Sequence, residues 1–221
     1  MSEAPSFADL ALAPDPPMDL LALAIAQEFR DVDARHALSA LDALGAELAQ
    51  SLAEIGDAPE DVARVCSDLL GARHGFRGDR EDYDDPGNSM LDVVLERRRG
   101  LPILLSVVYI EVGRRADIPI AGVGLPGHFV VAHFGADPPL LLDPFERGQV
   151  ITAVVADELL PPWRAHEIAM RMLNNLVGSY QRRANLTAAI RAASMRLDLP
   201  AEGSLTSTLQ AELRALQARL N

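Results

Sequence analysis

The run Gly100–Arg114, which is apolar almost all the way round, most constrains what this chain can fold into. A helix with apolar side chains on every face is stable only when other elements cover most of its surface. Pro102 stands at the first turn of this run, where a missing backbone N–H leaves no hydrogen bond unmade. The sequence therefore predicts a buried central helix around which the rest of the chain packs.

The hydrophobic period changes from helical to alternating after Asp117-Ile-Pro. Alternation of this kind predicts short strands at about 120–123, 127–134 and 140–143. Turn residues separate the strands at 124–127 and 135–139, and no helix intervenes. We therefore predict an α+β fold, with a small antiparallel sheet packed on the buried helix.

Helical periodicity flanks this core on both sides. Four segments are predicted: a flexible, proline-rich lead-in with little order (1–17), an N-terminal helical segment (18–75), the core (76–160) and a C-terminal helical segment (161–221). Within the last segment, 175–200 is similar to one tetratricopeptide (TPR) unit, a helix–turn–helix that ends at a proline. Residues 203–220 predict a final amphipathic helix.

Composition and charge exclude several classes of function. The 32 acidic residues outnumber 20 basic residues, and every basic residue is arginine, so the net charge is −12. Nucleic acid and anionic membranes are therefore poor partners, because binding to phosphates needs clustered cations. The apolar stretch 20–26 is too short to span a bilayer, and no secretory pattern appears, so we expect a cytoplasmic protein.

Cys66 is the single cysteine, which excludes an internal disulfide framework and a multi-cysteine zinc site. We expect it to pack as a small core residue. No cofactor or metal site is predicted, since His128 and His133 have opposite parity on one strand and face opposite sides. The oligomeric state stays open.

His128 and Asp143 form the pair with the clearest chemical potential. If residues 133 and 138 close a four-residue hairpin loop, His128 lies directly opposite Asp143, with Cβ atoms about 4.5–5.5 Å apart. A carboxylate in that place orients an imidazole, as in a nucleophile–base–orienter triad. The inference depends on register, because a shift of one residue puts the two side chains on opposite faces. A purely structural hydrogen bond at a strand end fits the same pattern.

Three motifs occur in an order that identifies a family. They are Asn88–Ser89 with 94–102, then Gly124–Phe129, then Leu142–Phe145. In this order they resemble the bacterial transglutaminase-like/TPR family, the Sir-B-type invasion-regulator group. The resemblance is strong from about 76 to 143 and looser from 18 to 200. It implies a papain-like, transglutaminase-like core flanked by helices, with His128 and Asp143 as members of a Cys-His-Asp triad.

The chain departs from this family at the nucleophile. Counting back from Asp117, which stands where the Gly-Ile-Pro element of active relatives begins, the catalytic cysteine falls at Pro102. Ser106 shares the face of Pro102 but lies about 5.4 Å deeper along the helix, too far for the ~2.6–3.2 Å contact of proton transfer. We expect its hydroxyl to bond to the carbonyl one turn back. Ser89, with Asp92 three residues on, predicts a capping box.

Our leading hypothesis is therefore a non-catalytic, protein- or peptide-binding regulatory module that keeps the His128/Asp143 half of a triad. A groove beside Pro102 and His128 would hold the partner. Arg97 and Arg98 belong to the cluster 96–99, which either binds an acidic partner or phosphate or is structural. In the structural case, Glu96 and some of the arginines form ion pairs that fix the segment leading into the buried helix, and the other arginines are solvated.

Two other hypotheses stay open, and with them the question of whether the protein is an enzyme. One is a hydrolase or acyltransferase that uses Ser106 or Ser89 as nucleophile with His128 and Asp143. The other is a structural interaction protein that assembles through its acidic surface and its last helix.

Overall fold

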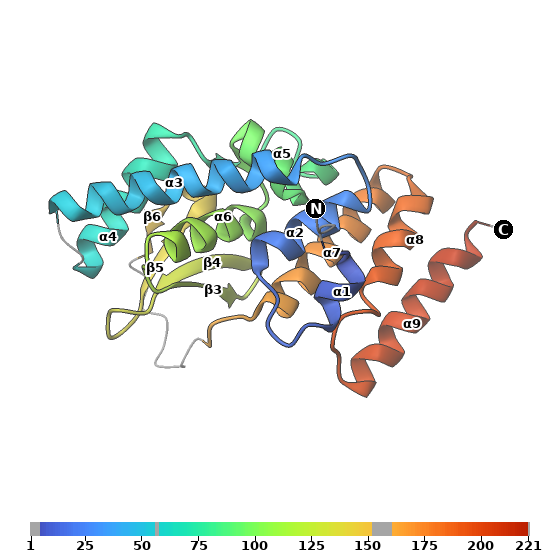
Figure 1. Ribbon diagram of the computed structural model, residues 1–221. Coiled ribbons are helices and arrows are strands. Elements are labelled where there is room, and N and C mark those ends of the chain that lie inside the picture. Colours follow the sequence, from blue (N-terminus) through green and yellow to red (C-terminus); the bar gives the residue numbers. More distant parts are fainter. Residues whose placement is uncertain (1–4, 56–57, 152–160, 221) are drawn as a thin grey trace.

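The computed structural model describes residues 5–55, 58–151 and 161–220, and combines many helices with small sheets (Figure 1). The α-helices are α1 (Phe7–Leu12), α2 (Met18–Gln27), α3 (Ala34–Ile55), α4 (Pro59–Cys66), α5 (Leu91–Arg97), α6 (Pro102–Arg115), α7 (Ala165–Arg182), α8 (Leu186–Met195) and α9 (Gly203–Ala218). Shorter turns are the π-helical η1 (Ser67–Arg73) and the 3₁₀ turns η2 (Pro86–Ser89) and η3 (Pro144–Glu146). The strands are β1 (Arg77–Gly78), β2 (Arg99–Gly100), β3 (Ile120–Leu125), β4 (His128–His133), β5 (Leu140–Asp143) and β6 (Gln149–Val150).

The predicted central helix is α6, and its burial is confirmed. It lies between α3 and the strands β3 and β4 (Figure 1). Leu104, Val108 and Val112 expose none of their surface, and Pro102 is at the first helical position as expected. With apolar contacts on both sides, the helix fixes the distance between the helical layer and the sheet.

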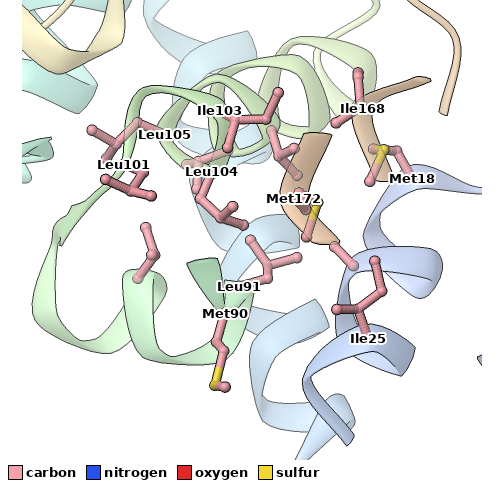
Figure 2. Close-up of a cluster of buried hydrophobic side chains, with 14 of the residues drawn as sticks. Met18, Ile25, Met90, Leu91, Leu101, Ile103, Leu104, Leu105, Ile168 and Met172 are labelled. Carbon is pink, nitrogen blue, oxygen red and sulfur yellow. The ribbon is translucent and has the colours of Figure 1, made fainter. Parts of the chain in front are cut away.

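The first two turns of α6 sit in a cluster of apolar side chains from several helices. Figure 2 shows Leu101, Ile103, Leu104 and Leu105 beside side chains from other parts of the chain. Leu91 comes from α5, Ile25 and Met18 from α2, and Ile168 and Met172 from α7. This packing holds the start of α6, and therefore Pro102, against segments that are far apart in the sequence.

The main sheet has four antiparallel strands in the order β3-β4-β5-β6, and the three predicted strands are confirmed as β3, β4 and β5. Leu125 pairs with His128, so the β3–β4 turn contains only Pro126 and Gly127. Gly127 has φ +74°, which a turn with proline at its second position and a left-handed residue at its third requires. The parallel pair β1–β2 leads into α6 and was not predicted.

The register predicted for the β4–β5 hairpin is wrong by two residues. His133 pairs with Leu140 rather than with residue 138, and Val131 pairs with Leu142. Pro138 and Pro139 have no N–H to donate to the ladder, so they stay in the loop and pairing begins at Leu140. The same register places Asp143 opposite Val130, so His128 is its diagonal neighbour. A shift of two residues keeps both side chains on one face of the sheet.

The expectation of little order at the N-terminus is corrected for the described part of 1–17. Residues 7–12 form α1, where Ser6 and Asp9 make a reciprocal capping box. Phe7 and Leu10 are buried in the main core, which explains why this short helix is held in place. Residues 1–4 of the lead-in, and 152–160 at the end of the predicted core, lie outside the described residues.

The C-terminal segment is helical, as predicted. Helices α7 and α8 pack on each other as a hairpin joined by a short turn at 183–185, and α9 packs on α8 (Figure 1). The predicted apolar face of this last helix is covered only in part: Leu209 and Leu216 are buried, whereas Leu205 and Leu220 near its ends are exposed. Among the described residues, no helix is long and apolar enough to cross a membrane.

Charged side chains join the end of α6 to the N-terminal helices. The Arg115 guanidinium donates to Asp19 of α2 at 2.7 Å and to Asp42 of α3 at 2.7 Å. Glu111 also lies in this cluster, and its burial raises the pKa of its carboxyl above the ordinary value. A buried carboxylate is tolerated here because both arginines at the end of the helix bond to it.

The turn after η3 packs against the π-helical segment η1, which holds its backbone in place. Arg147 has φ +60°, and its carbonyl oxygen accepts a hydrogen bond from the Ser67 hydroxyl at 3.2 Å. Gly71 packs directly on the same carbonyl, so a Cβ at residue 71 would overlap it. The absence of a side chain at Gly71 is what allows η1 and the turn to touch.

Gly71→Ala is therefore expected to destabilise the protein by about 1–3 kcal/mol, the usual cost of forcing extra atoms into a packed site. Urea unfolding at neutral pH measures the change. Gly203→Ala is the matched control, because nothing lies within 4 Å of a Cβ at that position. Equal midpoints for both variants would contradict the close packing at Gly71.

Candidate functional site

His128 and Asp143 are in direct contact, as predicted from the sequence, although the strands pair in a different register from the predicted one. The imidazole Nε2 lies 2.8 Å from Asp143 Oδ2. The His128 side chain is 32% exposed and that of Asp143 13%, so the imidazole borders solvent while the carboxylate is mostly covered. A carboxylate only accepts hydrogen bonds, so Nε2 carries the proton in this pair. The arrangement leaves Nδ1 as the nitrogen available to another group.

The other oxygen of Asp143 holds the backbone that follows it. Oδ1 accepts the backbone N–H of Phe145 at 2.9 Å and that of Glu146 at 3.4 Å, which caps the turn η3. The carboxylate is therefore positioned by the main chain as well as by the imidazole. Asp143 has two roles, one in orienting His128 and one in shaping the turn.

Phe145 forms the side of the site next to the imidazole. Its ring meets the His128 ring edge to face, with centroids 6.4 Å apart, and the Tyr83 ring at 6.3 Å. The guanidinium carbon of Arg80 lies 5.5 Å from the Phe145 centroid, within range of a cation–π interaction. Gly78 packs against the same ring, where a Cβ would overlap it. These residues give the site an aromatic wall with a cation on it.

Pro102 stands at the first position of α6 and is half-buried. Its side chain has no atom that can act as a nucleophile. The first position of α6 is therefore occupied by a saturated ring rather than by a thiol or a hydroxyl.

Cys66 is confirmed as a core residue. It is the last residue of α4 and exposes none of its surface. Burial raises the pKa of its thiol to about 12, so almost none of it is thiolate at neutral pH. The thiolate is the nucleophilic form, so Cys66 is chemically silent in this structure.

Ser89 and Ser106 are completely buried, and both structural predictions for them are wrong. Ser89 does not cap α5, because the capping position is Met90 and no side chain caps the helix there. Asp92 forms an ion pair with Arg30 instead. The Ser106 hydroxyl has no hydrogen-bond partner in the described residues, so the expected bond to the carbonyl one turn back is not made.

Arg97 and Arg99 form ion pairs, but with acids from other segments rather than with Glu96. Arg97 binds Asp85 at 2.6 Å and Arg99 binds Glu81 at 2.8 Å. Arg98, in a left-handed conformation with φ +58°, stacks on another aromatic ring, that of Phe76, at 4.9 Å. Ion pairs thus tie the segment leading into α6 to residues 81 and 85, but the predicted pairing with Glu96 is not the one that forms.

His133 lies away from the His128–Asp143 pair and plays a structural role. It is buried, and its Nδ1 accepts the backbone N–H of Gly135 at 3.1 Å. Burial lowers the pKa of the imidazole below its ordinary value. Within the described ranges, no group of three or more His, Cys, Asp or Glu side chains is placed to hold a metal ion.

Two cavities border the core. One of about 450 Å³ adjoins Phe145 and is lined by β1, residues 79–81, Arg99, 145–147 and Gln149. Another of about 840 Å³ lies beside Asp19, Glu111 and Trp163, on residues that the sequence analysis did not select. Asp19 and Glu111 of the larger cavity already bind the arginines at the end of α6. The smaller cavity is the one next to the His128 site.

Comparison with known proteins agrees with this fold and with the order of its motifs. A family profile described as the transglutaminase-like superfamily matches residues 35–177, which include α6, His128 and Asp143. The chain belongs to the transglutaminase-like superfamily. No solved structure gives a significant match.

Several relatives of this transglutaminase-like chain carry the name UPF0162 protein. One from Xylella fastidiosa (strain Temecula1) is 33% identical over 216 residues, which cover 88% of this chain and 76% of the relative. One from Pseudomonas aeruginosa is 37% identical over 109 residues, 49% of this chain and 39% of the relative. Human F-box only protein 21 is 28% identical over 162 residues, 66% of this chain but only 25% of that protein.

Some residues of the site were not selected from the sequence. Phe145 belongs to the Leu142–Phe145 motif, but only the structure shows its ring against the imidazole. Arg80 and Gly78 lie in a stretch that reads as a polar surface loop, and no periodicity marks them as neighbours of Phe145. The short parallel pairing of β1 with β2 brings that stretch to the site.

His133 makes stability depend on pH. Because its pKa is lowered in the folded protein, the unfolded chain binds more protons below about pH 6.5, so stability falls as pH drops through that value. We expect urea unfolding of the wild type to show a larger loss between pH 7.5 and 5.5 than that of His133→Asn. His36→Asn, at an exposed position, should keep the wild-type dependence. The same loss in all three proteins would contradict the assignment.

Proposed function

We propose that this transglutaminase-like protein is a non-catalytic module that binds a peptide or a protein segment at the His128 site. The observation that carries the proposal is the intact His128–Asp143 hydrogen bond on a sheet packed against a helix that starts with Pro102. The pair keeps the geometry of a base and its orienting group, while the position for a nucleophile holds a proline.

The other candidate nucleophiles support this proposal by their burial. A base can activate a hydroxyl or thiol only within hydrogen-bond reach, and a substrate must also reach that group. Cys66, Ser89 and Ser106 all expose no surface. A hydrolase or acyltransferase that uses Ser106 or Ser89 therefore requires the core around α6 to open, and no observation favours it over binding.

Side chains around His128 have the composition of a recognition surface. Tyr83 is 50% exposed, and Arg80, stacked on Phe145, is more exposed still. Aromatic and arginine side chains are enriched where proteins bind one another, because they combine large apolar area with directed polar groups. The imidazole adds Nδ1, which can donate to or accept from a peptide backbone.

The helical hairpin of α7 and α8 supports a regulatory rather than an enzymatic role. We assign it as a single TPR-like unit, as in the Sir-B-type group that the motifs resemble. TPR units serve as binding scaffolds, and a single unit has to pack on another element to bury its face. Here α7 packs on α2 and α6.

Binding without turnover is the first expected result. We expect the native protein to retain a subset of a synthetic hexapeptide library on gel filtration, and mass spectrometry to find those peptides unchanged. His128→Ala should reduce retention at least tenfold, and His36→Ala, an exposed histidine, should not. Peptide products that disappear with His128→Ala would overturn the non-catalytic assignment.

Pro102→Cys tests whether Pro102 occupies the position of a nucleophile. A thiol at a helix N-terminus beside an imidazole has a pKa below the usual ~8.5 and reacts fast as thiolate. We expect alkylation by iodoacetamide at pH 7 in the variant but not in the wild type, whose Cys66 is buried. Adding His128→Ala should slow alkylation about tenfold or more. An ordinary rate that does not depend on His128 would remove Pro102 from the site.

A further inference from the structure

The cavity beside Phe145 has an imbalance of charge that the His128 site does not explain. Its volume of about 450 Å³ is in the range of a small ligand site. Of the three acids that line it, Glu81 binds Arg99 at 2.8 Å and Glu146 binds Arg80. The third, Asp79, accepts the backbone N–H groups of residues 81 and 82, both at 3.1 Å. All three carboxylates therefore have partners.

Two arginines that line the same cavity, Arg77 and Arg147, have no carboxylate partner among the described residues. Arg77 is half-buried and, among the described residues, donates only to the carbonyl of Gly75, at 3.2 Å. Arg147 is exposed at the mouth of the cavity, and its side chain makes no hydrogen bond or ion pair within the described residues. A half-buried guanidinium without a carboxylate is unusual in a chain with 32 acids and 20 arginines. The lining holds four arginines and three acids, so the cavity carries one excess positive charge, opposite in sign to the net charge of the whole protein.

Arg147 occupies a backbone conformation that favours another residue. Its φ of +60° is in the left-handed region, where glycine has no steric penalty and arginine has one. Ser67 and Gly71 hold the Arg147 carbonyl in place, so the surrounding structure maintains the conformation. Strain of this kind gathers at binding sites. An arginine in this conformation thus places its guanidinium at the cavity at some cost in backbone energy.

The cavity shares the Phe145 ring with the His128 site. Asp143 binds the imidazole and caps η3, and Arg147 follows directly after η3. Phe145 lines the cavity, and its ring also packs edge to face with the His128 ring. A peptide that lies across Phe145 would therefore meet the imidazole at one side of the ring and the cavity at another.

We propose that this cavity binds a carboxylate of the peptide held at the His128 site, through Arg77 and Arg147. Guanidinium groups recognise carboxylates by paired, charge-assisted hydrogen bonds. The carboxylate belongs either to an acidic side chain or to the C-terminus of the peptide. The inference rests on the proposed function, since it names the chemistry of the ligand for the same site.

Three tripeptides test the proposal by ¹H–¹⁵N NMR of the full chain. The first is acetylated and amidated with a central glutamate, the second has glutamine in its place, and the third is the glutamine peptide with a free carboxyl terminus. We expect the amides of Gly78, Phe145 and Gly148 to shift with the first or the third peptide and not with the second. The responding peptide shows which source of carboxylate is preferred. Raising the salt concentration should weaken the effect.

Arg147→Gly is the decisive variant, because glycine adopts the left-handed backbone without strain and only the guanidinium is lost. We expect it to weaken carboxylate binding at least tenfold, with no loss of stability in urea. Arg77→Gln should weaken binding similarly. Arg171→Gln, an exposed arginine on α7, is the control of equal charge and should bind as the wild type.

Three results would each overturn the inference. The first is equal shifts with the amidated glutamine peptide, and the second is full carboxylate binding by Arg147→Gly. The third is a set of shifts with inorganic phosphate but with neither carboxylate peptide. The His128→Ala variant separates it from the proposed function. If this variant loses binding of all three peptides equally, the peptide site stands and the carboxylate subsite fails. If carboxylate binding needs Arg147 but not His128, the subsite stands and the role of His128 fails.

Discussion

The burial of α6 is the constraint on which the rest of the structure depends. A helix with almost no polar face must be covered on all sides, and α3, the sheet and the packing of α2, α5 and α7 around its first turns do so. Covering the helix places the sheet at a fixed depth. It also places the strand that begins with His128 against α6, so the site is a consequence of core packing rather than of a separate loop structure.

The pairing of His128 with Asp143 shows how a prediction can succeed for a reason different from the one given. The register was wrong because Pro138 and Pro139 cannot join the ladder. The contact still forms because a two-residue shift preserves the face, and a diagonal neighbour on one face remains within reach of a histidine. The alternation of side chains between the two faces of a strand can be followed in the sequence. It was enough to predict that His128 and Asp143 share one face of the sheet.

Other parts of the site were beyond the reach of sequence patterns. The left-handed conformation of Arg147 cannot be recognised there, because the residue type argues against it. The two-residue strands β1 and β2 are too short to show alternation, yet they bring Gly78 and Arg80 to Phe145. The Ser89 motif predicted a cap, but the chain uses Met90 and buries the serine in contact with the core. Tertiary contacts decided each of these positions.

The two members of the pair differ in what the fold requires of them. Asp143 caps η3 through two backbone N–H groups, so the turn needs a carboxylate there even if the protein has no chemistry to perform. His128 has no comparable structural duty: it is one-third exposed, and its ring bonds only to Asp143 among the described residues. An imidazole that the fold does not need, held in one orientation at the edge of solvent, is better explained by a ligand than by stability. Substitution of His128 therefore tests the proposed function more directly than substitution of Asp143, whose loss would also disturb the turn.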